Sequence, residues 1–212
     1  MIPVNMNQIF DEESQDVGCQ EAPAVKETYF AGKSDSEIWR MFRAGHEGAF
    51  RYIYDTYLDI LFQYGCHLTG DRDLIKDCIH DLFIELRQGK KISDTDSIKY
   101  YLLKAFRWKL QRLINKKRRL FFSNETPVTV NIEASFEAQL IDAQVDNEIR
   151  EKLNKALSSL SARQKEALYY FYYHDLTYEQ VASMMNLSNI KSARNLVYKS
   201  IDILKVYFKR IG

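Results

Sequence analysis

The chain has 212 residues and 46% of them are hydrophobic, which is enough apolar material for one or two small folded domains. Its three cysteines are too few and too scattered for a disulfide framework. No segment approaches the roughly 18 apolar residues that a membrane-spanning helix needs, and no signal peptide is evident, so we expect a cytoplasmic protein.

The formal net charge of +1 conceals a strong segregation of charge along the chain. Residues 99–119 carry nine basic residues and no acidic residue, whereas residues 120–148 carry six acidic residues and no basic residue. Residues 149–212 carry eleven basic and five acidic residues. Two separated basic blocks in a nearly neutral chain indicate two contacts with one polyanion.

A tail and a first helical domain are predicted for the N-terminal part of the chain. Residues 1–34 are polar, acidic and aperiodic, which favours a disordered tail. Over residues 35–119 the apolar residues recur at helical spacing. We expect Ser36 to cap the first helix of this domain, which ends at Arg43.

Two longer helices with an apolar stripe each are predicted next. The first covers residues 47–68, and Gly70 closes it because glycine accepts a left-handed turn. Asp71 or Asp73 caps the second helix, and Gly89 ends it.

A basic helix then starts at Ser97 and ends in the cationic run of residues 116–119. Its lysines and arginines alternate with tyrosine, phenylalanine and tryptophan. Aromatic rings offer stacking surfaces for unpaired bases, and the cations offer contacts to phosphates. From the residues alone, an ordinary helix with a buried stripe and a solvated basic face explains the pattern equally well.

The acidic residues 120–148 predict a flexible linker, and residues 149–212 predict a second helical domain. The strongest local pattern there is a helix-turn-helix. Thr177 caps its first helix, Ala182 is small where two helices approach each other, and Asn186 tolerates the positive φ that the turn needs.

The second helix of this motif, capped by Ser188 or Asn189, has the character of a recognition helix for the DNA major groove. We expect Leu187 and Ile190 to fill the core between the two helices. Arginine and asparagine side chains can read guanine and adenine through paired hydrogen bonds, while lysine and serine grip phosphates. An ordinary helix pair with a solvated basic face is the alternative. The exposed face presents Lys191, Ser192, Arg194, Asn195, Tyr198 and Lys199.

The order of these parts resembles the extracytoplasmic-function (ECF) group of RNA polymerase sigma factors, over roughly residues 36–210 apart from the linker. Residues 45–88 resemble sigma regions 2.1 to 2.2, residues 97–119 resemble regions 2.3 to 2.4, and residues 162–205 resemble region 4. The resemblance implies an all-α, non-enzymatic protein with two small domains and no cofactor. Such a protein binds core RNA polymerase, recognises the −10 and −35 promoter elements, and directs the initiation of transcription.

The resemblance also assigns residues to three contacts. The polymerase contact, on the β′ clamp helices, would use Asp77, His80, Asp81 and Glu85. The −10 contact would use Gln88, Lys90, Lys91, Ser93, Asp94, Lys104, Arg107, Trp108, Lys109 and Arg112. The −35 contact would use Lys191, Ser192, Arg194, Asn195, Tyr198 and Lys199.

Three positions depart from the common pattern of these relatives. His80 stands where they have glutamine, Trp108 where many have asparagine, and Leu196 where many have a basic residue. The implied partners are core polymerase, including its β flap, and promoter DNA, with no small-molecule substrate. Many relatives are also held by a membrane-anchored anti-sigma factor, and the composition resembles the subgroup found in Bacteroidetes.

Two other classes of function were weighed. An enzyme is disfavoured because the sequence has no phosphate-binding loop, no glycine-rich dinucleotide turn and no nucleophile elbow. A metal site built from Cys66-His67 with Cys78 and His80 is disfavoured because the last two residues fall on opposite faces of one helix. A conventional helix-turn-helix regulator is the remaining alternative, but it leaves residues 35–119 without a role.

Overall fold

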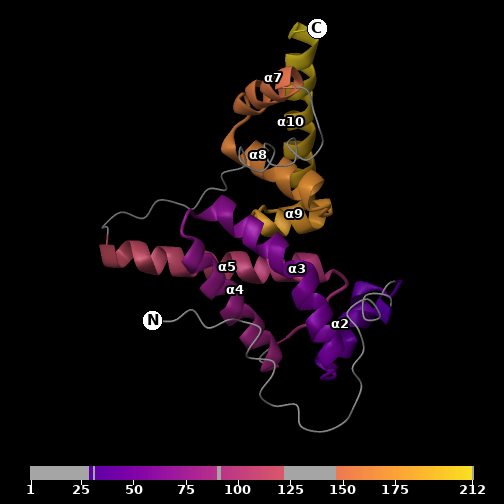
Figure 1. Ribbon diagram of the computed structural model, residues 1–212. Coiled ribbons are helices and arrows are strands. Elements are labelled where there is room, and N and C mark those ends of the chain that lie inside the picture. The colour runs from indigo at the N-terminus through magenta and orange to yellow at the C-terminus, as the bar shows by residue number, and fades with distance from the viewer. Residues whose placement is uncertain (1–28, 31, 90–91, 122–146, 212) are drawn as a thin grey trace.

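The computed structural model describes residues 29–30, 32–89, 92–121 and 147–211. Every regular element within these residues is a helix, so the all-α prediction is confirmed. None of the helices described is both long enough and apolar enough to cross a bilayer. Figure 1 shows two groups of helices, one formed by the N-terminal part of the chain and the other by the C-terminal part.

The N-terminal group consists of α2 (Asp35–Arg43), α3 (Glu47–Leu68), α4 (Arg72–Arg87) and α5 (Ile98–Phe121). α3 packs against each of the other three helices, and α5 also contacts α4 and α2. Their shared core is rich in aromatic rings, which bury a large apolar area per residue. Its largest fully buried side chains include Trp39, Tyr64 and Phe106.

One glycine lets three of these helices approach closely. A Cβ at Gly65 of α3 would lie 2.7 Å from Cγ2 of Ile75 on α4 and 3.1 Å from Cζ of Phe106 on α5. Both distances are shorter than ordinary van der Waals contact between carbon atoms. Gly65 therefore lies where α3, α4 and α5 converge, and its missing side chain permits their close approach.

The ends of these helices differ in detail from the predictions. The cap of α2 is Ser34, not Ser36, because Ser34 forms a reciprocal capping box with Glu37. Asp71 caps α4 and accepts a hydrogen bond from the Leu74 backbone at 3.2 Å. Gly70 does not adopt a positive φ, so the prediction that it closes α3 by a left-handed turn was wrong.

The folded region begins before the predicted end of the tail. Phe30 is buried, and its ring lies 4.9 Å from that of Tyr52 on α3. A residue assigned to a disordered tail is thus part of the core, and it packs beside the N-terminal part of α3. Residues 1–28 of the predicted tail lie outside the described residues.

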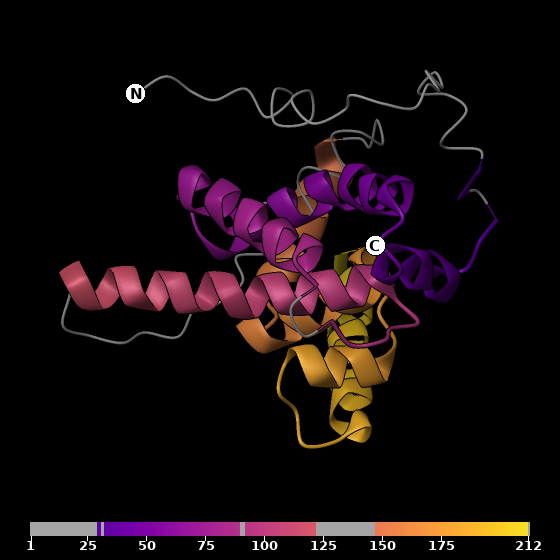
Figure 2. The ribbon, with the colours of Figure 1, turned by 90° about the horizontal axis from the view of Figure 1, so that it is seen from below.

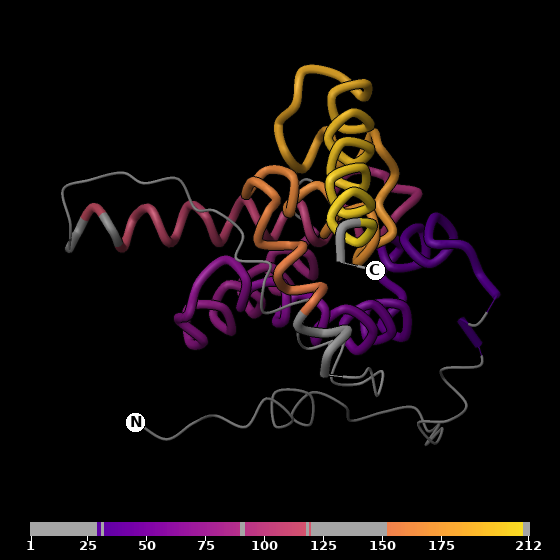
Figure 3. Tube along the Cα trace, turned by 90° about the horizontal axis from the view of Figure 1, so that it is seen from above, coloured from indigo at the N-terminus to yellow at the C-terminus, as the bar shows by residue number. Residues whose placement is uncertain are grey.

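The C-terminal group consists of α7 (Asn147–Ser158), α8 (Ala162–Leu168), a π-helical turn η2 (Tyr169–Tyr173), α9 (Tyr178–Met184) and α10 (Ile190–Ile211). α10 packs against α7, α8 and α9. Figures 2 and 3 show α10 standing across the direction of α5. Of the predicted linker, residues 122–146 lie outside the described residues.

Ser161 caps α8, and a π-helical turn rather than a further α-helical turn continues the helix after Leu168. The backbone N–H of His174 donates to the carbonyl of Tyr169 at 3.3 Å, five residues earlier, and Asp175 then takes a positive φ of 54°. Insertion of one extra residue into the helix rotates the side chains that follow. Tyr169 and Tyr170 are both buried there and face the N-terminal group.

Candidate nucleic-acid interface

The helix-turn-helix is formed as the sequence predicted, with one exception in its core. Thr177 caps α9 in a reciprocal box with Gln180, and Asn186 in the turn has a φ of 51°. Ala182 is buried between the helices. Ile190 does not fill this core, because 45% of its surface is exposed at the start of α10.

The first turns of α10 present the predicted recognition residues to solvent. Lys191, Arg194, Asn195, Tyr198 and Lys199 are exposed, and they leave the helix on the side away from the buried Ala193 and Val197. Ser192 is the one predicted −35 contact whose side chain is not fully exposed.

Ser192 instead stabilises the helix end. Its backbone N–H and its hydroxyl both donate to Oδ1 of Asn189, at 2.8 and 3.0 Å. Asn189 rather than Ser188 is therefore the cap of α10. The hydroxyl hydrogen of Ser192 is used in its bond to Asn189. The remaining hydrogen-bonding capacity of Ser192 lies in its oxygen lone pairs.

An aromatic side chain that sequence reasoning missed holds Arg194. The guanidinium of Arg194 lies 5.3 Å from the centre of the Tyr178 ring. That ring stacks on Phe171 at 4.6 Å and lies 6.3 Å from Tyr198. A cation over a tyrosine face is attracted by the ring quadrupole, so Tyr178 restricts the directions in which Arg194 can reach. No local pattern predicts this pair, because the turn between α9 and α10 brings it together.

The outer face of α5 carries an exposed aromatic side chain and a cation side by side. Trp108 is 67% exposed, which is unusual for a residue of its size. The guanidinium of Arg112 lies 5.6 Å from the centre of its ring. An exposed flat ring beside a fixed positive charge provides both the stacking surface and the phosphate contact that an unpaired strand requires.

The loop before α5 is tied to α2. The indole Nε1 of Trp39 donates to the carbonyl oxygen of Ser93 at 2.9 Å, and Arg43 forms an ion pair with Asp94. Two other predicted loop contacts, Lys90 and Lys91, lie outside the described residues. Gln88 follows α4 as its C-cap and is exposed.

The predicted polymerase contact forms one exposed acidic face on α4. Asp77, His80, Asp81 and Glu85 are all exposed. Lys109 of α5 lies behind this face, where its Nζ atom contacts Glu85 at 2.7 Å and Asp81 at 3.8 Å, and only 15% of its side chain is exposed. Lys109 was predicted to contact DNA, but here it bridges to the acidic face.

The cysteine and histidine pairs of the disfavoured metal site point apart. Cys66 and His80 are exposed, whereas Cys78 is buried in the core. Burial raises the pKa of the Cys78 thiol to about 12, which keeps it protonated at neutral pH. Among the residues that the structure describes, no three histidine, cysteine or acidic side chains are grouped to hold a metal ion.

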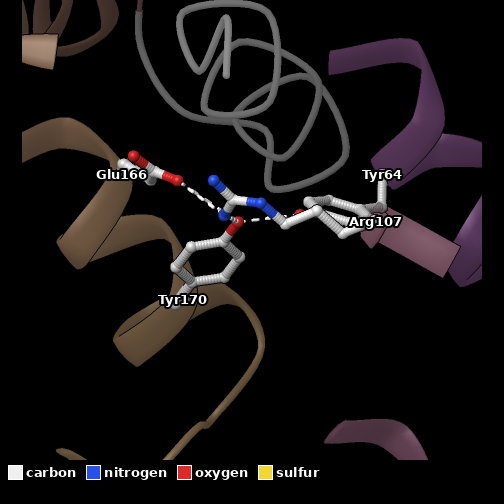
Figure 4. A network of polar contacts seen from close by, with 4 residues as sticks. All are labelled: Tyr64, Arg107, Glu166 and Tyr170. Atoms are coloured by element: carbon white, nitrogen blue, oxygen red, sulfur yellow. Dashed lines mark hydrogen bonds and ion pairs between the residues drawn. The ribbon is translucent and has the colours of Figure 1, made fainter. Parts of the chain in front are cut away.

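A network of polar contacts joins the two helical groups, and sequence reasoning missed it (Figure 4). Arg107 of α5 donates to Oε1 of Glu166 on α8 at 2.7 Å and also to the Tyr170 hydroxyl. Tyr64 of α3 and Tyr170 share a hydrogen bond of 2.7 Å between their hydroxyl groups. The side chains of Arg107 and Glu166 are only 16% and 15% exposed.

Burial controls the ionisation of this network. It raises the pKa of Tyr64 to about 12 and raises the pKa of Tyr170 as well, so both hydroxyls stay protonated and can donate. Burial alone would lower the pKa of the Arg107 guanidinium. The neighbouring Tyr170, Tyr64 and Glu166 outweigh that effect and raise it, so Arg107 remains charged.

A buried histidine lies beside this network. His174 is 2% exposed, and its ring lies 5.7 Å from that of Tyr64 and 4.7 Å from that of Tyr169. Its Nε2 atom is buried without a hydrogen-bond partner. Burial, with smaller effects from Lys99 and His67, lowers the pKa of His174 to about 3, so its imidazole is neutral.

The comparisons with known proteins point to the same family as the sequence. Residues 150–197, which include α8, α9 and the first turns of α10, match the family described as sigma-70, region 4. The chain is also 21% identical over 159 residues to the ECF RNA polymerase sigma factor SigM of Bacillus subtilis, covering 74% of this chain and 94% of that protein. Together these two matches support an ECF sigma factor.

One solved structure is similar to this chain over most of its length. It is the sigma factor RpoE of Bartonella quintana, determined in complex with the anti-sigma factor NepR. The TM-score is 0.47 and the sequence identity is 18%, and the match covers 76% of this chain and 96% of that chain. The family resemblance found in the sequence is supported by the region 4 match and by the likeness to SigM, and the Bacteroidetes subgroup stays a prediction.

Proposed function

We propose that this sigma factor binds core RNA polymerase in the cytoplasm, recognises the −10 and −35 elements of a promoter, and directs the initiation of transcription. The observation that carries the proposal is the match to sigma-70 region 4, which falls on a helix-turn-helix with an exposed cationic recognition face. A helix of this kind fits the major groove with its N-terminal residues against the bases.

In the −35 contact, Arg194 reads guanine and Asn195 reads adenine. Both side chains project from the first turns of α10 and are exposed. Each can form two hydrogen bonds to one base, which is the geometry that discriminates base pairs. Lys191 and Lys199 bind the flanking phosphates and set the position of the helix.

In the −10 contact, the outer face of α5 holds the melted strand. Trp108 stacks on an unpaired base, and Arg112 beside it binds a phosphate. The loop that precedes α5 completes the site, and its attachment to Trp39 and Arg43 fixes its place relative to the helix.

The acidic face of α4 binds the clamp helices of the β′ subunit, and the C-terminal group of helices binds the β flap. Asp77, Asp81 and Glu85 give this face its negative charge, and His80 adds a hydrogen-bonding group. An anti-sigma factor that covers these surfaces is a further partner. The resemblance to ECF sigma factors and the exposure of the residues concerned support these proposed roles.

Transcription reconstituted from purified components tests the proposal. Core polymerase supplemented with this chain should initiate from specific promoters, whereas core polymerase alone should not. Sequencing of the transcripts then gives the promoter elements. Tight binding of duplex DNA by the chain alone, with no effect on core polymerase, would instead identify a conventional helix-turn-helix regulator.

The recognition face is tested with two substitutions and a control on the same helix. Arg194→Ala and Asn195→Ala should each cost roughly 1–3 kcal/mol of discrimination at one −35 base pair. Lys205→Ala removes an exposed cation further along α10 and should leave the −35 preference intact. If both recognition variants keep the wild-type preference, α10 does not read the −35 element.

A further inference from the structure

The loop that leads into α5 is held by α2 and by the first turn of α5 itself. Residues 92–97 form no helix, yet two aromatic side chains fix Ser93 near the start of this loop. The indole Nε1 of Trp39 donates to the carbonyl oxygen of Ser93 at 2.9 Å, and the Trp39 ring packs on that of Tyr101 at 4.7 Å. Burial raises the pKa of Tyr101, whereas its hydrogen bonds with Ser93 counteract that rise. Ser93 is therefore held from two helices at once.

The end of the loop that joins α5 is fixed as well. Oδ2 of Asp35, the first residue of α2, accepts a hydrogen bond from the Ile98 backbone N–H at 2.8 Å. An N–H in the first turn of a helix has no partner within its own helix, and here α2 supplies one. Oγ1 of Thr95 accepts from the Ser97 N–H at 3.1 Å and donates to the Ser97 carbonyl at 2.9 Å. The loop is thus bonded to α2 near its start and just after its end.

The side chains that this loop presents to solvent are polar. Ser93, Asp94 and Asp96 are exposed, and 89% of the Asp94 side chain is accessible. Arg43 of α2 forms an ion pair with Oδ1 of Asp94. A carboxylate has about four lone-pair positions, so Asp94 can still accept a hydrogen bond from the amino group of an unpaired base. The ion pair with Arg43 limits the orientation in which it does so.

The loop lies on the same face of α5 as the exposed tryptophan. Tyr101, Trp108 and Arg112 recur at a spacing that places them along one side of a helix. With a rise of about 1.5 Å per residue, Trp108 lies roughly 10 Å along the helix axis from Tyr101. In the proposed −10 contact, a strand stacked on Trp108 would therefore meet the loop at a base only a few positions away.

We propose that α2 is a positioning element for the −10 contact, in which Trp39 and Arg43 hold the loop of residues 92–97 in one conformation and thereby set its base preference. This inference rests on the proposed function, because it concerns the selectivity of that same contact. Trp39 is 1% exposed, so it acts through Ser93 rather than on DNA. Arg43 acts through the carboxylate of Asp94.

The physical basis is that a fixed loop discriminates between bases better than a moving one. A wrong base can be accommodated on a fixed loop only by breaking the contacts that hold it, whereas a free loop rearranges around any base. The indole N–H is a donor only, and its loss would leave the Ser93 carbonyl without its partner on α2. The difference in affinity between the preferred base and the other bases should then become smaller.

The test uses holoenzyme assembled from core polymerase and the full chain with either Trp39→Phe or Arg43→Gln. Trp39→Phe keeps a buried ring beside Tyr101 and removes the indole N–H. Arg43→Gln changes a side chain that is 39% exposed, so this variant folds independently of the core. Phe42→Leu is the control for packing, since the Phe42 ring lies 5.1 Å from that of Trp39 and has no polar atom. Arg40→Gln is the control for charge, since Arg40 is exposed on the same helix.

The probes are labelled single strands that carry the −10 element of a promoter used by the holoenzyme, with each base replaced in turn. Trp39→Phe should reduce the base preference at one position by about two- to tenfold, the range expected for one hydrogen bond. Arg43→Gln should reduce the preference at the same position by about twofold, as expected for an exposed ion pair. Preferences at the other positions, and all preferences of both controls, should stay at wild-type values.

A double variant tests whether Arg43 acts through the loop. In a chain with Asp94→Ala, the further change Arg43→Gln should alter no base preference, because the guanidinium has already lost the carboxylate that it orients. An additional loss of preference in the double variant would mean that Arg43 contacts the strand directly, which would overturn its positioning role.

Two results would overturn the inference as a whole. One is unchanged base preferences in Trp39→Phe and Arg43→Gln, whether or not the affinity for all strands falls. The other is a change in Phe42→Leu equal to that in Trp39→Phe, because core packing would then explain the effect. Failure of the proposed function is distinguishable, since wild-type holoenzyme would then initiate at no promoter. Normal initiation by wild type combined with either result removes only the positioning role of α2.

Discussion

Protonation of His174 should weaken the folded chain in mildly acidic solution. The pKa of His174 is lowered to about 3 by burial, whereas an exposed histidine titrates near pH 6.5. Between these two values the unfolded chain therefore holds one more proton than the folded chain at this position. The resulting stability is fully present above about pH 6.5 and is lost as the pH falls below it.

The size of the effect follows from that one proton. The free energy of unfolding should fall by up to about 1.4 kcal/mol for each pH unit below the unfolded pKa, in addition to contributions from other groups. His174→Phe keeps an aromatic ring among Tyr64 and Tyr169 but removes the titration. Wild type and variant should thus diverge in pH dependence between about pH 6.5 and pH 5.

Urea unfolding at a series of pH values measures this difference. The slope of unfolding free energy against pH should be less steep for His174→Phe than for wild type. Identical slopes for wild type and His174→Phe would refute the reasoning, because the buried imidazole would then not be excluded from protonation.

Three further substitutions probe the core, the recognition face and the polymerase contact. Gly65→Ala should destabilise the chain by roughly 1–3 kcal/mol in chemical denaturation, because its methyl group would overlap Ile75; unchanged stability would mean that α3 and α4 move apart easily. Tyr178→Leu should weaken binding to the −35 duplex by about 0.5–1 kcal/mol through loss of the ring that positions Arg194, and Tyr178→Phe should restore it; equal losses in both variants would point to the hydroxyl instead. Asp81→Lys should reduce holoenzyme assembly in a pull-down with core polymerase, whereas the control Asp59→Lys on α3 should not. Equal assembly by both variants would show that the acidic face of α4 does not contact the polymerase.

Most helices of this fold were predictable because their apolar stripes are long and regular. α3 begins and ends at the expected residues. The positive φ of Asn186 was predictable because asparagine is one of the few residues other than glycine that tolerate this conformation. Helix ends were less predictable where several residues can cap. Ser34 and Ser36 are chemically equivalent, and Ser34 is chosen because Glu37 completes a reciprocal box with it.

Features that depend on contacts between distant segments were not predictable. The π-helical turn inserts one residue after α8, and no local pattern distinguishes it from a regular helix. Ile190 has an apolar side chain that suits a core, but the start of α10 leaves it exposed. The pairing of Arg107 with Glu166 joins residues 59 positions apart, so only the packing of the two helical groups reveals it.

Lys109 connects two surfaces for which different partners are proposed. Its charge is held by Glu85 and Asp81, so the acidic face of α4 and the helix α5 share one electrostatic contact. A partner that engages these carboxylates would release the lysine toward a phosphate. Thermodynamic linkage makes the effect reciprocal, and DNA bound at α5 would then increase the affinity of α4 for its partner by the same factor. Under the proposed function, one side chain would couple polymerase docking to promoter capture.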